Sequence, residues 1–89
     1  MKFSWDEPKA KSNLAKHGVS FEEAVTVFAD PLALVVEDVE HVDRVILVGM
    51  ATSGRLLLTV FTEMDEDEVR IISARRATSH ERSHYEEGV

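Results

Sequence analysis

The sequence contains no cysteine, only two prolines, and only one tryptophan and one tyrosine. Without cysteine there is no disulfide framework and no cysteine-based zinc site, so any metal would need histidine and carboxylate ligands. Long hydrophobic runs are also missing, since residues 1–20 carry polar or charged side chains throughout and show neither a signal peptide nor a membrane span. We therefore expect a cytoplasmic protein with no membrane contact, formed by a single small domain over residues 1–89 with room for one site.

Positive charge is scarce as well, because ten lysines and arginines stand against seventeen acids and the formal net charge is −7. This balance argues against a nucleic-acid partner, whose phosphates are contacted by Lys and Arg. The distribution is uneven, however: residues 1–20 hold four lysines against two acids, residues 69–85 hold four arginines against one acid, and residues 21–68 hold twelve acids against two arginines. Two basic ends therefore flank an acidic middle. The densest acidic runs, 37–43 and 63–68, read most simply as solvated loops.

A first helix is predicted between Asp6, which can cap its N-terminus, and Gly18, which can adopt the left-handed conformation that ends a helix. Pro8 fits the first turn, where its missing N–H costs nothing. At 100° per residue, one face of this helix gathers Lys9, Asn13, Lys16 and His17. The first helix is therefore predicted to present a cationic face.

A second helix should follow at once, because "SFEE" matches a capping box in which Ser20 caps the helix and Glu23 reaches back to the Ser20 N–H. The pair Asp30-Pro31 should end it. Its predicted buried side chains are Phe21, Ala24, Val25 and Phe28.

Four β-rich runs follow, "LALVVE", "DRVILVGMA", "RLLLTVFTE" and "EVRIISARR", and their short connections favour antiparallel pairing. A second capping box at Thr78 and Glu81 predicts a short closing helix. The predicted fold is α+β, with two N-terminal helices, a four-stranded antiparallel sheet and a short C-terminal helix. An additional short strand at Phe3 to Trp5 is left open.

The stretch "HERSH", residues 80–84, matches H-E-x-x-H, a pattern in which two helical histidines hold zinc and the glutamate activates a bound water. A catalytic zinc needs a third protein ligand, which in such enzymes lies well downstream, yet only five residues follow His84. A zinc hydrolase is therefore not expected, and no metal or cofactor is predicted. His80 and His84 are interpreted as exposed groups on a helix face, with adventitious zinc binding as the alternative.

Two longer segments carry a family resemblance. They are "WDEPKAKSNLAKHGVSFEEAVTVFADP" and "RIISARRATSHERSHYEE", and their most specific features are Trp5-Asp6, Lys9, Asn13, Lys16 to Ala24, Ile72 to Thr78, Glu81-Arg82 and Tyr85. Together they resemble the BrnT family, the toxin half of bacterial type II toxin-antitoxin pairs, over nearly the whole chain.

This resemblance implies a RelE-like fold and a ribonuclease that cleaves mRNA and arrests translation. It also implies a BrnA-like ribbon-helix-helix antitoxin encoded beside the toxin. Because the ribbon-helix-helix fold is an obligate dimer, a heterotetramer of two toxins and two antitoxins is expected. Operator DNA would be contacted only through the antitoxin.

The residues permit metal-independent RNA cleavage, because RNA supplies its own nucleophile, the 2′-hydroxyl. The enzyme must then hold the phosphate in line, stabilise its charge and move two protons. Arginine is suited to phosphate, and "RIISARR" supplies Arg70, Arg75 and Arg76. On a strand Arg75 and Arg76 have opposite parity, but we expect both to be usable because the strand should give way to the helix there.

The predicted catalytic residues are His17, Arg75, Arg76 and Lys16, and the predicted RNA-binding residues are Lys9, Arg70, Arg82 and Tyr85. Histidine is a side-chain type suited to acid-base chemistry, which makes His17 a candidate, and Lys16 can neutralise developing charge. Which group acts as general base and which as general acid stays open, with Glu81 and Tyr85 as further candidates.

Structural explanations compete for several of these residues. His17 could simply interact with the helix dipole, the two arginines could pair with Asp6, Asp30 or Glu81, and the face carrying Glu81 and Tyr85 could hold the chain end onto the sheet. An alternative function follows from the acidic net charge and the histidines of the last helix. It is a catalytically inactive binding module that acts with its antitoxin as a transcriptional co-repressor.

Overall fold

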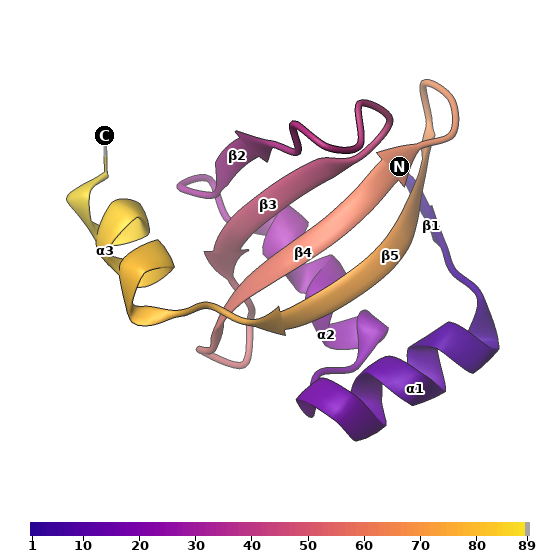
Figure 1. Cartoon of the computed structure of the whole chain (residues 1–89), viewed down its shortest axis with the longest axis horizontal. Coiled ribbons are helices and arrows are strands. Elements are labelled where there is room, and N and C mark those ends of the chain that lie inside the picture. The colour runs from indigo at the N-terminus through magenta and orange to yellow at the C-terminus, as the bar shows by residue number, and fades with distance from the viewer. Residues whose placement is uncertain (89) are drawn as a thin grey trace.

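The computed structural model describes residues 1–88, in which three helices, one 3₁₀ segment and five strands are found (Figure 1). In chain order they are β1 (Lys2–Ser4), α1 (Glu7–His17), α2 (Phe21–Val25), η1 (Thr26–Ala29, the 3₁₀ segment), β2 (Leu34–Glu37), β3 (Val45–Met50), β4 (Leu56–Glu63), β5 (Glu68–Arg76) and α3 (Ser79–Glu87). The predicted α+β class and the short C-terminal helix are confirmed.

The sheet is mixed and has the strand order β1-β5-β4-β3-β2. The strands from β2 to β5 pair antiparallel, but β1 lies parallel to β5, with Phe3 opposite Val69. The predicted four-stranded antiparallel sheet is therefore wrong in strand number and in direction. The reason is that β1 has only three residues and pairs with a strand near the other end of the chain. Local turn signals cannot reveal such a contact.

Both N-terminal helices are capped as predicted, but the second is shorter than expected. Asp6 accepts a hydrogen bond from the Lys9 N–H at 3.2 Å where α1 begins, and Gly18 ends that helix with a φ of 69°. The Ser20 hydroxyl accepts from the Glu23 N–H at 3.0 Å where α2 begins. After a little more than one turn, α2 tightens into η1.

The capping box predicted at Ser20 is incomplete, because the Glu23 carboxylate has other partners. It accepts hydrogen bonds from the Arg55 guanidinium and the Ser53 hydroxyl, which lie in the connection between β3 and β4. Arg55 also donates to the Gly18 carbonyl oxygen at 2.9 Å. The hydrogen bonds from Arg55 hold the pKa of Glu23 below its ordinary value. Glu23 therefore joins the helical layer to the sheet.

The main core lies between the sheet and the layer formed by α1, α2 and η1 (Figure 1). Its fully buried members include Val19, Phe21, Val27, Leu57 and Ile71. A smaller cluster of Val48, Leu56 and Leu58 lies on the opposite face, with Tyr85 of α3 packed against it. Because α3 covers only part of that second face, the rest of it stays open.

A buried polar residue, Asn13, ties α1 to β5. Its side-chain amide donates to the carbonyl oxygens of Ala74 (2.8 Å) and Val19 (3.0 Å), and its own oxygen accepts from the Ala74 N–H (3.1 Å). Asn13 is therefore a buried link, not part of an exposed cationic face. These bonds place the end of α1, which carries Lys16 and His17, beside the end of β5.

Replacing Asn13 by Ala should lower the free energy of unfolding by about 1–3 kcal/mol, because buried backbone groups of Val19 and Ala74 lose their partners. The matched control is Ser12→Ala on the exposed side of the same helix, which should change the free energy by less than about 0.5 kcal/mol. Urea unfolding of both variants measures the difference. Equal stability of the two variants would contradict the assigned role of Asn13.

Candidate active site

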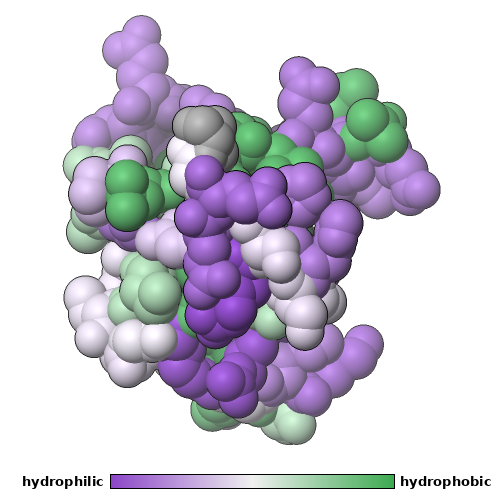
Figure 2. Space-filling view, turned by 90° about the vertical axis from the view of Figure 1, so that its left-hand side faces the viewer, coloured by the Kyte–Doolittle hydropathy of each residue, from purple (hydrophilic) through white to green (hydrophobic). Residues whose placement is uncertain are grey.

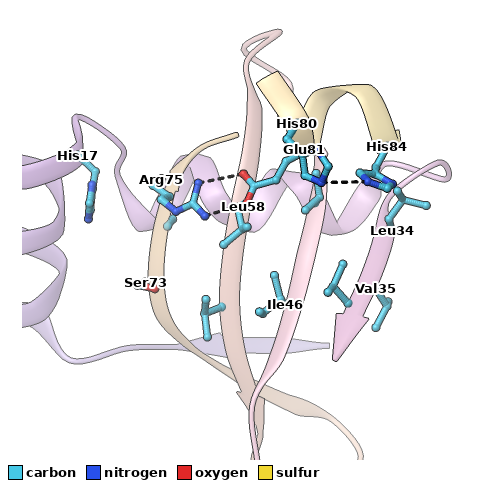
Figure 3. Close-up of a pocket in the computed structure, with 14 residues that line it drawn as sticks. His17, Leu34, Val35, Ile46, Leu58, Ser73, Arg75, His80, Glu81 and His84 are labelled. Carbon is cyan, nitrogen blue, oxygen red and sulfur yellow. Dashed lines mark hydrogen bonds and ion pairs between the residues drawn. The ribbon is translucent and has the colours of Figure 1, made fainter. Parts of the chain in front are cut away.

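The open face of the sheet forms a groove of about 770 Å³ that is walled on one side by α3 (Figure 3). Its floor is apolar and consists of Leu34, Val36, Ile46, Val48, Leu58 and Val60. The register explains this floor, because Val48 lies opposite Leu58 and Ile46 lies opposite Val60, so both pairs share one face. The alternate residues of the same strands, such as Leu47 and Leu57, belong to the main core.

The polar residues that line the groove are His17, Ser73, Arg75, His80, Glu81 and His84. They come from α1, β5 and α3 and are spread across the groove, from His17 on one side to His84 beside Leu34 on the other (Figure 3). Figure 3 shows Arg75 between His17 on one side and Glu81 on the other. His17 and Arg75, predicted from opposite ends of the sequence, are thus brought to the same groove.

Arg75 and Glu81 form two parallel hydrogen bonds, each 2.9 Å long. Glu81 also completes the capping box predicted at Thr78: its carboxylate accepts from the Thr78 N–H at 2.8 Å, and its N–H donates to the Thr78 hydroxyl at 3.2 Å. The hydrogen bonds from Arg75, together with that from the Thr78 N–H, hold the pKa of Glu81 below its ordinary value. In this arrangement Arg75 is charged but already paired.

Tyr85 anchors α3 to the sheet. Its hydroxyl donates to Asp30 Oδ2 at 2.6 Å, and the same oxygen accepts from the Met50 N–H at 2.8 Å. The hydrogen bond to Asp30 raises the pKa of Tyr85. The hydroxyl is therefore committed to a structural bond and stays protonated, which accounts for Tyr85 without contact to a nucleobase.

The end of α1 extends the polar part of the groove. A second, shallower hollow is lined by Lys9, Lys16 and Ser12, and it shares His17 and Ser73 with the groove. Lys9 and Lys16 therefore lie on one continuous surface with Arg75. Of the four arginines in residues 69–85, Arg75 alone reaches this surface, so the two basic ends converge only in part.

Arg76 is not part of this surface. β5 stays extended through Arg76, so the expectation that the strand alternation lapses there is wrong. Arg75 lies opposite Leu58 of the groove floor, whereas Arg76 lies opposite Leu57 of the main core. The two arginines therefore point to opposite faces of the sheet.

Two other predicted RNA-binding residues also lie outside the groove. Arg70 pairs in register with Thr62 and Ser4, toward the opposite end of β5 from Arg75. Arg82 is exposed on α3 and forms an ion pair with Glu86 at 3.5 Å. Neither side chain lines the groove or the hollow beside α1.

Sequence reasoning missed Ser73, His80 and His84 as groove residues. The Nε2 atoms of His80 and His84 lie 3.2 Å apart, so at least one of the two rings must be unprotonated to accept this hydrogen bond. Within residues 1–88, no three His, Cys, Asp or Glu side chains gather in a way that could hold a metal ion. Ser73 could have been found from strand parity, because it shares its face with Arg75.

The side of the molecule that carries α3 is mostly hydrophilic at its centre, with separate hydrophobic patches toward its upper margins (Figure 2). None of the helices described is long and apolar enough to cross a membrane.

Comparisons with known proteins identify the family. A family model described as ribonuclease toxin, BrnT, of type II toxin-antitoxin system matches residues 5–81. Among solved structures, the crystal structure of the Brucella abortus ribonuclease toxin BrnT matches with a TM-score of 0.73 and 28% identity, over 89% of this chain and 99% of that chain. No curated protein matches. Because the family model spans most of the chain, the chain belongs to the BrnT family of ribonuclease toxins of type II toxin-antitoxin systems.

Proposed function

We propose that this toxin is a metal-independent endoribonuclease that cleaves mRNA by attack of the 2′-hydroxyl and thereby inhibits translation. The observation that carries the proposal is that His17 and Arg75 line the same end of one groove. This end joins the hollow that carries Lys9 and Lys16. A ribose-phosphate held there would meet both positive charge and a group able to move a proton.

The chemistry assigns a role to each group. Arg75 holds the scissile phosphate through its planar fork and stabilises the charge that develops on it. Lys16 and Lys9 position the adjoining phosphates of the chain. The 2′-oxygen bonds to the adjoining phosphorus while the bond from phosphorus to the 5′-oxygen breaks, so one proton leaves the 2′-hydroxyl and one reaches the departing 5′-oxygen. His17 makes one of these two transfers and water makes the other, because the lowered pKa of Glu81 makes that carboxylate a weak base and the Tyr85 hydroxyl is held by Asp30.

Substrate binding requires that the pair between Arg75 and Glu81 opens. A phosphate carries two oxygens in the same fork geometry as a carboxylate, so it can take the place of Glu81 on Arg75. The side chains of Arg75 and Glu81 are 38% and 23% exposed, so the pair is within reach of solvent and of an incoming phosphate. Glu81 is therefore a competitor of the substrate phosphate.

We also propose that a BrnA-like ribbon-helix-helix antitoxin neutralises this toxin, in a complex of two toxins and two antitoxins that contacts operator DNA only through the antitoxin. A second candidate function is a toxin fold without cleavage activity that serves as co-repressor in that complex. The observation that favours it is the closed pair of Arg75 and Glu81, which leaves the groove without a free arginine.

The first test compares two adjacent arginines. Arg75→Ala should lower RNA cleavage by the purified toxin about 10²–10³-fold, because the phosphate loses its main charge partner. His17→Ala should lower it about 10²-fold or more. Arg76→Ala is the matched control and should keep near-normal cleavage, because Arg76 lies on the other face of the sheet.

On expression without antitoxin, Arg75→Ala and His17→Ala should relieve growth arrest, whereas Arg76→Ala should still arrest growth. Loss of cleavage in Arg76→Ala together with normal cleavage in Arg75→Ala would place the site on the opposite face. A wild-type protein that folds but neither cleaves RNA nor arrests growth would favour the co-repressor.

The second test concerns Glu81. Glu81→Gln keeps the capping geometry but removes the charge that competes for Arg75, so the affinity for a short non-cleavable RNA should rise about 2–5-fold. The effect is measured by fluorescence anisotropy at neutral pH. Glu87→Gln, on the same helix, outside the groove and without an ion pair within residues 1–88, serves as the charge-matched control. Equal gains in both variants would show a general charge effect and contradict competition at Arg75.

The difference in stability between wild type and Glu81→Gln should depend on pH. The folded state lowers the pKa of Glu81 below its ordinary value of 4.5, so the ionised carboxylate stabilises the fold above about pH 4.5. This contribution is lost as the pH falls through the lowered value. Wild type should therefore be more stable than Glu81→Gln by up to about 1 kcal/mol at neutral pH, with a difference that shrinks in acid. Urea unfolding at several pH values measures it, and a pH-independent difference would refute the ionic contribution.

A further inference from the structure

The outer edge of β2 is bare and apolar. β2 ends the sheet and pairs only with β3. Four valines in and after it are exposed, namely Val35 (69%), Val36 (45%), Val39 (86%) and Val42 (99%). An edge strand with unpaired backbone groups and exposed apolar side chains invites pairing with another chain, and proteins normally cover or charge such edges. We call residues 35–43 the valine edge.

The valine edge has a defined shape. Asp38 Oδ1 accepts from the N–H groups of Glu40 (3.1 Å) and His41 (3.2 Å), which holds the loop after β2. Beside it lies a hollow of about 450 Å³ lined mainly by the four valines and Val45. The valine edge is therefore an ordered apolar surface.

The negative charge of the valine edge indicates what kind of partner can bind there. Three acids lie open among the valines, Glu37, Glu40 and Asp43, against one arginine, Arg44, which lines the same hollow. A fourth acid, Asp38, is already bonded to His41 and to the loop backbone. The open acids would repel RNA, and they would repel each other if two copies of this chain paired edge to edge. The occupant that fits is a protein segment with apolar and basic side chains. A type II system supplies such a candidate in its antitoxin.

We infer that the antitoxin binds the valine edge as an extended segment of alternating apolar and basic residues that adds a strand to β2. Its backbone pairs with β2, its apolar side chains pack on Val35, Val39 and Val42, and its Lys or Arg side chains face the open acids Glu37, Glu40 and Asp43. This inference rests on the proposed neutralisation by an antitoxin. It does not depend on the catalytic roles of His17 and Arg75.

The test uses the purified toxin and the protein encoded by the adjoining reading frame. Val39→Ser combined with Val42→Ser should weaken binding about 10-fold or more, because two exposed apolar contacts are lost and both positions lie outside the groove. The matched control combines Leu14→Ser with Met64→Ser, which removes two other exposed apolar side chains, 50% and 54% exposed. The control should bind normally.

Charge and backbone pairing are tested separately. Affinity should fall as salt is raised, and Glu40→Lys combined with Asp43→Lys should both weaken binding and flatten this salt dependence. In the complex, hydrogen exchange of the β2 amides at residues 34–37 should slow. RNA cleavage by each free variant should equal that of wild type, since neither pair of positions lies in the groove.

Several results would overturn the inference. They are unchanged affinity of the valine variant, absence of binding between the two wild-type proteins, or unprotected β2 amides in the complex. Light scattering that shows a dimer of the free toxin, dissolved by the valine variant, would assign the edge to a second copy instead. A toxin that binds its antitoxin as described but cleaves no RNA would refute the nuclease proposal and leave this inference standing.

Discussion

The two hydrogen bonds between Arg75 and Glu81 join the last strand to the last helix and decide the state of the groove. Glu81 is held in place twice, by Arg75 and by the cap at Thr78, so in the proposed function its carboxylate occupies the position that a phosphate would take on Arg75. A fully buried pair of this kind would cost several kcal/mol to break, because an unpaired charge would remain in a medium of low dielectric. This pair is partly open to water, so opening it costs less than opening a fully buried one.

The net charge of −7 does not forbid RNA binding, because the fold separates the two signs along the strands. Both acidic runs lie at the end of the sheet where β4 turns into β5 and where β2 leads to β3, since Val45 pairs with Phe61. Arg75 lies near the other end of β5. The seven steps along the strand from Glu68 to Arg75 span about 23 Å at the usual rise of a strand, which exceeds a Debye length of about 8 Å at physiological salt. The basic end of the groove is therefore largely screened from the acidic runs.

The sequence contained the signals that act over a few residues, and these were predicted. The caps at Asp6, Gly18 and Thr78 depend on neighbouring residues, and the strands from β2 to β5 follow from short apolar runs. Contacts between residues far apart in the sequence could not be predicted from such local signals. The pairing of β1 with β5 and the bond between Tyr85 and Asp30 join residues whose proximity exists only after folding.

In the candidate site, too, the residues could be predicted from the sequence but their arrangement in space could not. His17 and Arg75 could be chosen from their chemistry and from the family resemblance, but their proximity depends on Asn13, whose buried bonds to Ala74 set the position of α1 against β5. The prediction that Arg76 faces the substrate together with Arg75 is wrong, because it requires the strand to end before Arg76. Pairing of Leu57 with Arg76 keeps the strand extended to that point and turns the side chain away from the groove.

The apolar floor of the groove limits where RNA can bind. Leu34, Ile46 and Leu58 offer no hydrogen bonds to phosphates or bases, so the proposed phosphate contacts must come from the polar residues of the groove, above all Arg75. Val35 and Val36 line both this groove and the hollow at the valine edge, which makes the two surfaces continuous. A partner bound along β2 must therefore extend across the floor as far as Arg75 to exclude a phosphate from it.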